Sequence, residues 1–105
     1  MDLVKKKREL TIDGKKYFMC FDMRSVVMFR EISGTSFTHA IPHLFAGDDM
    51  TLINFMGATI RPKDKPKDII GKEIYKMDIL ELLLNHSKEV TALIASSMPQ
   101  RDGKK

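Results

Sequence analysis

The chain has 105 residues, of which 43% are hydrophobic and 30% charged, and a formal net charge of +4 at pH 7. This length and composition are typical of one soluble globular domain with a thin core. No apolar run approaches the roughly 20 residues of a membrane-spanning helix, and no apolar run follows the basic start as in a signal peptide. We expect a domain over 8–98 between a flexible basic leader, 1–7, and a flexible tail, 99–105.

The positive charge is concentrated in three segments, with +3 over residues 1–21, +3 over 61–77 and +2 over 99–105. The segments between them are mildly acidic. In "RPKDKPKD", lysines alternate with aspartates and prolines interrupt them, which favours a solvated loop over a track that binds phosphates. The charge pattern therefore argues against nucleic acid as the partner.

Residues 8–21 predict a β-hairpin, because two runs of alternating apolar residues flank Asp13 and Gly14. Gly14 can take the positive φ of a tight two-residue turn. With such a turn one face carries five apolar side chains, whereas a three-residue loop would exchange the faces: Leu10, Ile12, Tyr17, Met19 and Phe21. Since an isolated hairpin is marginally stable in water, we expect it to lie against helices or another chain.

Helices are predicted from residue 22 onward. Asp22 is a good N-cap and Gly34 a good C-terminal stop for the first helix. Its predicted apolar face is Met23, Val26, Val27, Phe29 and Ile32. A shorter second helix lies in "SFTHAIPHLF", where Pro42 is tolerated if the helix begins near Thr38 and breaks it otherwise. A turn and cap at 47–49 precede a third helix, whose predicted core residues are Leu52, Ile53, Phe55, Met56 and Ile60.

Pro62 and Pro66 end the third helix and predict a loop over 61–71. The remainder is helical by pattern, with one stripe of Ile74, Met77, Leu80, Leu83 and Leu84 and another of Val90, Leu93, Ile94 and Met98. The phase of the pattern drifts at 85–87, which favours two helices over one long helix. The predicted fold class is α+β: an N-terminal hairpin followed by four or five helices in one mostly helical domain.

The sequence offers little reactive chemistry. The single cysteine, Cys20, sits among apolar residues and is expected to be a buried hydrophobe. His39 and His43 have a spacing that suits two metal ligands, but a zinc site needs a third, such as Asp48 or Asp49. We favour two surface histidines, and predict no catalytic, cofactor-binding or metal-binding residue. The protein is therefore expected not to be an enzyme.

The run Ile79–Leu84 is apolar on more than one helix face, which indicates contacts on two sides. Either a partner or the protein's own helix bundle could cover it. The chain also has eight methionines, which suit adaptable contact surfaces. The predicted partner-binding residues are Leu82, Leu83, Ile94 and Met98.

The stretch "LTIDGKKYFMCFDMRSVVMFREISGTSF" resembles the start of phage tail assembly chaperones of the Gram-positive siphophage and prophage type. Those proteins open with a hairpin of the form L-x-I-[ND]-G-K-x-Y, then "F-D" before a helix that ends in an acidic-hydrophobic-G-x-S-F element. The matching residues are Leu10, Ile12, Asp13, Gly14, Lys15, Tyr17, Phe21, Asp22, Glu31, Ile32, Gly34, Ser36 and Phe37. The resemblance extends over residues 8–98, and its specific part is 10–37.

The resemblance implies a protein-binding function without catalysis or cofactor. Such chaperones bind the helical tape measure protein and keep it soluble until tail tube protein polymerises around it. They act in the host cytoplasm and are absent from the mature virion, and self-association into a homo-oligomer is compatible with this role. The alternatives are a small basic nucleic-acid-binding or regulatory phage protein, or a head-tail or tail component of the virion.

Overall fold

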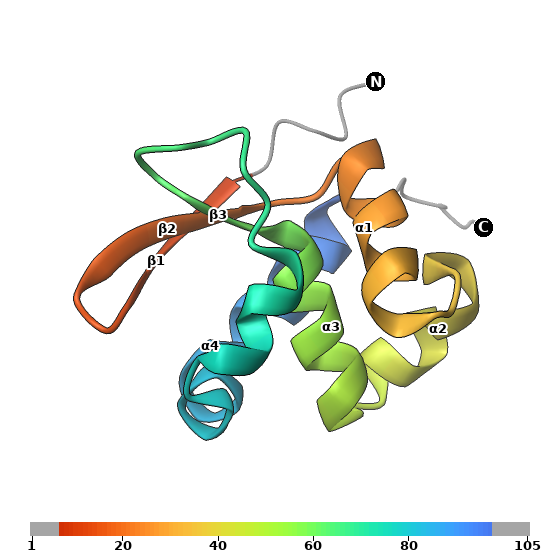
Figure 1. Ribbon diagram of the computed structural model, residues 1–105. Coiled ribbons are helices and arrows are strands. Elements are labelled where there is room, and N and C mark those ends of the chain that lie inside the picture. Colours follow the sequence, from red (N-terminus) through yellow and green to blue (C-terminus); the bar gives the residue numbers. More distant parts are fainter. Residues whose placement is uncertain (1–6, 98–105) are drawn as a thin grey trace.

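A three-stranded antiparallel sheet lies over a group of helices in the computed structural model, which describes residues 7–97 (Figure 1). The strands are β1 (Lys7–Ile12), β2 (Lys15–Cys20) and β3 (Ile60–Pro62). The helices are α1 (Met23–Ser33), α2 (Phe37–Phe45), α3 (Asp49–Thr59), the 3₁₀ helix η2 (Gly71–Lys76) and α4 (Ile79–Ser97). The predicted α+β class is confirmed.

The hairpin has the predicted two-residue turn. Asp13 and Gly14 have φ values of 52° and 77°, the left-handed conformations that a tight hairpin turn requires. Leu10 consequently lies opposite Tyr17 in the register of β1 and β2. The predicted shared face is confirmed, since all five of its apolar residues belong to the core cluster.

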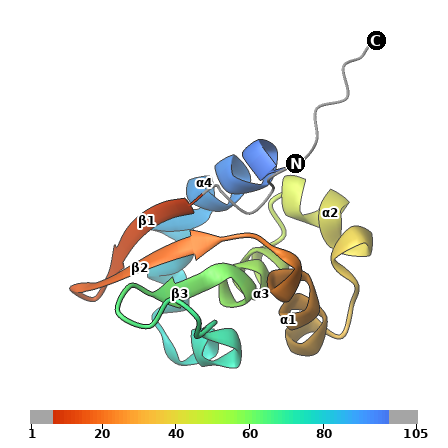
Figure 2. The same ribbon diagram turned by 90° about the horizontal axis from the view of Figure 1, so that it is seen from above.

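The predicted loop 61–71 is wrong at both ends. Ile60–Pro62 forms β3, which pairs with β2 so that the strand order is β1-β2-β3 (Figure 2). The backbone N–H of Ile70 donates to the carbonyl of Ile60 at 3.0 Å. Gly71 already begins η2. Three residues with a terminal proline carry no strand pattern, so only pairing with distant β2 defines this strand.

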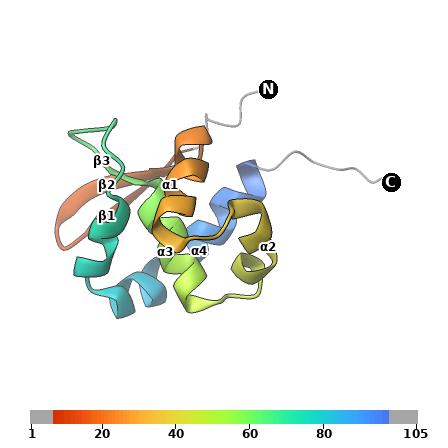
Figure 3. The ribbon, with the colours of Figure 1, turned by 45° about the vertical axis from the view of Figure 1, so that its right-hand side comes forward.

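Helix α3 is the central helix of the fold. Every residue from Leu52 to Thr59 is buried, as expected for a helix covered on all sides. It contacts α1, α2, α4, η2 and β2, and Figure 3 shows α1 in front of it and α2 to its right. Gly57 permits the approach of η2, because a Cβ at this position would lie 2.7 Å from the carbonyl oxygen of Gly71.

The predicted start and end of the first helix and the predicted start of the third are confirmed, but the third helix ends at Thr59, one residue before the predicted Ile60, which belongs to β3. Asp22 caps α1, and Gly34 ends it with a φ of 78°. Asp48 caps α3 by accepting a hydrogen bond from the backbone N–H of Thr51 at 3.0 Å. Helix α2 begins at Phe37, after the cap Ser36, and continues through Pro42.

The prediction of two C-terminal helices is wrong, because α4 runs without a break through residues 85–87. The chain instead bends at Met77 and Asp78, and the Asp78 carboxylate accepts a hydrogen bond from the N–H of Glu81 at 3.1 Å. One helical stripe is buried or half-buried along the helix, with Ile79, Leu83 and His86 half-buried and the others buried: Ile79, Leu82, Leu83, His86, Val90, Leu93 and Ile94. These residues recur at a constant helical spacing. The break in the apolar pattern that predicted two helices arose because Leu80 and Leu84, which are exposed, were counted in the stripe.

Candidate partner-binding surface

Two of the four predicted partner-binding residues are buried in the structure and so are not accessible to a partner. Leu82 and Ile94 are 0% and 1% exposed, and both belong to the core cluster. Leu83 is partly buried against the same cluster. Met98 lies outside the described residues. The expected surface position of Leu82 and Ile94 is therefore corrected: they face the fold's own interior on α4 and leave no area for a partner.

Helix α1 instead presents apolar side chains to solvent. Met23 is 72% exposed and Val27 is 56% exposed, and their spacing of four residues places them on one helix face. Ser25 and Phe29 are the residues that α1 buries. The predicted apolar face of α1 therefore included two residues, Met23 and Val27, that do not belong to the core. We call the exposed surface centred on Met23 and Val27 the α1 face.

Two open grooves flank the α1 face. One has a volume of about 300 Å³ and is lined by Met23, Arg24, Val27, Met28, Glu31 and Ile69. The other, of about 450 Å³, lies toward the start of α2 and is lined by Val26, Val27, Arg30, Glu31, Ser36, Phe37 and Thr38. Figure 3 shows α1 between α2 on one side and η2 on the other. The result is an apolar ridge between two shallow grooves, with charged side chains at its C-terminal end.

A buried ion pair fixes the start of α1 to the sheet. Arg61 on β3 is 5% exposed, and its guanidinium donates to the Asp22 carboxylate at 2.9 Å and to the Ser25 hydroxyl at 3.3 Å. The Ser25 hydroxyl in turn donates to the carbonyl of Cys20 at 3.0 Å. Within residues 7–97, Nε of Arg61 is a buried donor without a hydrogen-bond partner.

Asp22 also completes the capping of α1. It accepts a hydrogen bond from the backbone N–H of Ser25 at 3.1 Å, while the Ser25 hydroxyl accepts one from the backbone N–H of Asp22 at 3.3 Å, which completes a capping box. Burial raises the pKa of the Asp22 carboxyl, but the hydrogen bonds from Arg61 and Ser25 outweigh burial, and the pKa lies below its ordinary value of 3.8. The carboxylate is therefore ionised at neutral pH and pairs with Arg61.

A second bond holds the rim of the first groove. The guanidinium of Arg24 donates to the carbonyl of Lys67 at 2.7 Å. This bond joins α1 to the segment that leads to Ile69, which lines the groove. The α1 face is thus anchored at its N-terminal end by Arg61 and along one side by Lys67.

Other exposed apolar side chains lie on α4 and near α2. Leu80 and Leu84 are 65% and 74% exposed, four residues apart on the first half of α4. The sequence pattern places them on one apolar stripe with Leu83, but the structure leaves both exposed. Phe45 and Met50 are exposed at the end of α2 and the start of α3. None of these four residues lines any of the five best-formed grooves in the described part of the chain, so the α1 face is the better candidate.

A polar pocket of about 330 Å³ brings His39, His43 and Asp48 to its lining. The Asp48 carboxylate is engaged in capping, because the Thr51 hydroxyl donates to it at 2.6 Å and the Thr51 N–H at 3.0 Å. These hydrogen bonds lower the pKa of Asp48. In the part of the chain that the structure describes, no group of three histidine, cysteine or acidic residues is arranged to hold a metal.

No protein-family model, curated protein or solved structure that we compared with the chain matches it. Over residues 7–97, no helix combines the length and the apolar character needed to cross a bilayer. The functional class is therefore inferred from the side chains and from the sequence resemblance of residues 10–37.

Proposed function

We propose that this protein is a tail assembly chaperone of the phage or prophage type, which binds the tape measure protein and keeps it soluble while tail tube protein polymerises. The observation that carries the proposal is the exposure of Met23 and Val27 between two grooves. Both residues lie within 10–37, the segment that resembles such chaperones. The proposed activity is protein binding without catalysis, in the host cytoplasm, by a protein absent from the finished virion.

The shape of the α1 face favours a helical client. A helix with apolar residues at positions i, i+4 and i+7 can lie along the ridge and place side chains in both grooves. Arg30 and Glu31, which line the grooves at the other end, can pair with charged residues beside that apolar stripe. A tape measure protein is a long helical chain with such stripes, so it presents many equivalent sites.

The energy of a single contact is expected to be small. Covering two partly exposed side chains of this size contributes roughly 2–3 kcal/mol, and association itself costs several kcal/mol. One copy should therefore bind weakly and dissociate fast, and several copies along one client would be required to keep it soluble. Weak contacts are also suited to release, because polymerising tail tube protein can displace them one at a time.

Coexpression with the tape measure protein from the same genome tests the proposal. We expect the client to be soluble with the wild-type chain and to precipitate with Val27→Asp. Thr91→Asp is the matched control, because Thr91 is exposed on α4 and also β-branched. Both variants should keep their helical circular dichroism.

A client that is equally soluble without the chain would refute the chaperone function. Loss of solubilisation in Leu84→Asp but not in Val27→Asp would move the binding surface to α4. Mass spectrometry of purified particles provides an independent check: a chaperone is absent, whereas a head-tail or tail component is present.

A further inference from the structure

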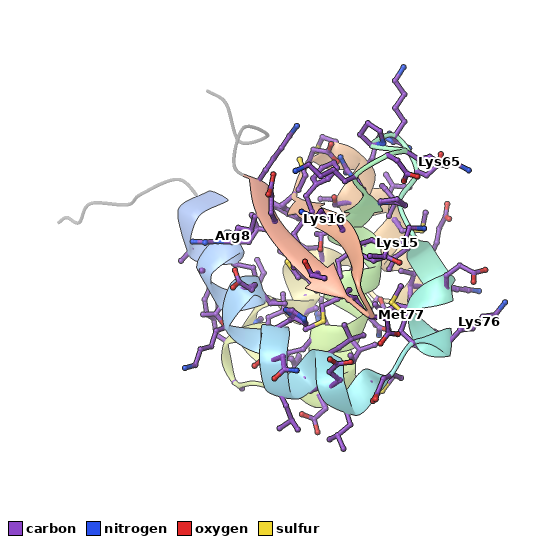
Figure 4. The ribbon with its side chains drawn as sticks, turned by 90° about the vertical axis from the view of Figure 1, so that its left-hand side faces the viewer. Arg8, Lys15, Lys16, Lys65, Lys76 and Met77 are labelled. Atoms are coloured by element: carbon purple, nitrogen blue, oxygen red, sulfur yellow. The ribbon has the colours of Figure 1, made fainter. Side chains whose placement is uncertain are left out.

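Lysines from two distant parts of the sequence meet at the tip of the hairpin. A groove of about 450 Å³ is lined by Gly14, Lys15, Lys16, Lys63 and Asp64. The backbone N–H of Lys63 donates to the carbonyl of Lys16 at 3.1 Å, which holds the segment after β3 beside the hairpin. Figure 4 shows Lys15 and Lys16 on the hairpin and Lys65 on the loop to their upper right. The fold therefore joins two short basic stretches that are separate in the sequence.

The charge of this groove is only partly neutralised. Lys63 forms an ion pair with Glu9 at 2.8 Å, and this contact with Lys63 lowers the pKa of Glu9. Among the described residues, no carboxylate lies within ion-pair distance of Lys15, Lys16 or Lys65. The groove thus retains a positive charge that is available to an anionic ligand.

Features around the groove favour a peptide over a nucleic acid. Proteins that bind single strands stack bases on exposed aromatic rings. The rings nearest to these lysines in the sequence, Tyr17 and Phe18, are buried, and the ammonium groups of Lys15 and Lys7 lie 5.6 Å and 5.1 Å from their centroids. The wall at Gly14 is bare backbone, since a Cβ there would meet nothing within 4 Å.

We propose that the groove between the hairpin tip and residues 63–65 binds an acidic, extended segment of a protein partner. Carboxylates of the segment pair with Lys15 and Lys16, which line the groove, and with Lys65 on the loop that continues from it, while its backbone lies against the open wall at Gly14. This surface is separate from the α1 face, and the proposal does not depend on the chaperone function.

Fluorescence anisotropy with a labelled oligoglutamate peptide tests the proposal, at a salt concentration of about 50 mM, where surface charges are weakly screened. The test variant is Lys16→Glu/Lys65→Glu. The matched control is Lys72→Glu/Lys88→Glu, which makes the same charge change at two exposed positions outside the groove. We expect the groove variant to weaken peptide binding roughly tenfold or more and the control to change it much less. Val27→Asp should bind the peptide as the wild type does.

Three results would overturn the proposal. The first is no binding of the peptide to the wild type, and the second is an equal loss in both double variants, which would indicate attraction by net charge alone. The third uses a labelled single-stranded oligonucleotide of equal charge: tighter binding of this probe than of the peptide, lost only in the groove variant, would assign the groove to nucleic acid. Retained circular dichroism in both variants excludes unfolding as the cause.

Discussion

Replacing Asp22 by serine isolates the energy of the buried ion pair with Arg61. Serine retains N-cap capacity but removes the charge that the guanidinium contacts at 2.9 Å. Breaking a buried pair from one side costs about 3–5 kcal/mol, because the remaining charge stays buried without compensation. The Asp22 side chain is 20% exposed and the Arg61 side chain only 6%, so solvent reduces the expected cost to about 2–4 kcal/mol.

Urea unfolding followed by far-ultraviolet circular dichroism measures this cost, since the chain contains no tryptophan for fluorescence. For a chain of this size, a loss of about 3 kcal/mol lowers the midpoint by roughly 2 M urea. Arg61→Met should restore much of the stability when it is added to Asp22→Ser, because a hydrophobic side chain then replaces the uncompensated charge. Asp22→Ser costing less than about 1 kcal/mol would show that Arg61 is hydrated, and would refute the account.

The same pair predicts a pH dependence with a definite sign. The pKa of Asp22 lies below its ordinary value of 3.8 in the folded protein. The unfolded state therefore binds more protons as the pH falls toward and below that value. The stability from Asp22 is fully present above pH 3.8 and is lost as the pH falls through the lowered pKa. Asp22→Ser should accordingly lose less stability than the wild type on acidification.

The remaining predictions concern packing and are checked by the same unfolding measurement. Leu82→Ala should cost about 2–5 kcal/mol, because it leaves a cavity in the core, whereas Leu84→Ala, at a 74% exposed position, should change stability by less than about 0.5 kcal/mol. Comparable costs at the two positions would mean that Leu84 is as buried as Leu82, and would contradict the orientation of α4 described above. Gly57→Ala should destabilise by about 1–3 kcal/mol, because the new methyl group would collide with the carbonyl of Gly71. A stabilised Gly57→Ala variant would mean that helix propensity outweighs this contact.

Local signals predicted much of the fold, because their causes are local. The turn at Asp13 and Gly14 and the cap at Asp22 each depend on a few neighbouring residues. The buried face of α4 could not be predicted in the same way. The run Ile79–Leu84 is compatible with two apolar stripes, and packing against the rest of the core determines which one is buried. His86 explains the difficulty. It is half-buried on the same helix face as Leu82 and Val90, so this face is interrupted by a polar residue and an apolar pattern does not identify it.

The candidate surfaces were harder to predict than the helices. Met23 and Val27 resemble core residues in the sequence, and their exposure follows only from the rotation of α1 that buries Ser25 and Phe29. One sequence signal was available: the apolar residues of α1 extend around more than half of the helix, so some had to face solvent. Arg61 gave no signal, because its partner Asp22 is 39 residues away.

One segment forms a wall of both candidate surfaces. This segment begins at Lys63, whose backbone N–H donates a hydrogen bond to the carbonyl of Lys16. It then passes Lys67, whose carbonyl accepts a hydrogen bond from Arg24, and reaches Ile69 beside the α1 face. Shortening this segment would disturb both surfaces through the backbone, so such a deletion could not separate their functions. Charge changes at Lys65 and at Val27 act only on local side-chain contacts and leave the backbone bonds at Lys63 and Lys67 in place. Independent effects of these two substitutions would therefore establish two separate binding surfaces on one rigid scaffold.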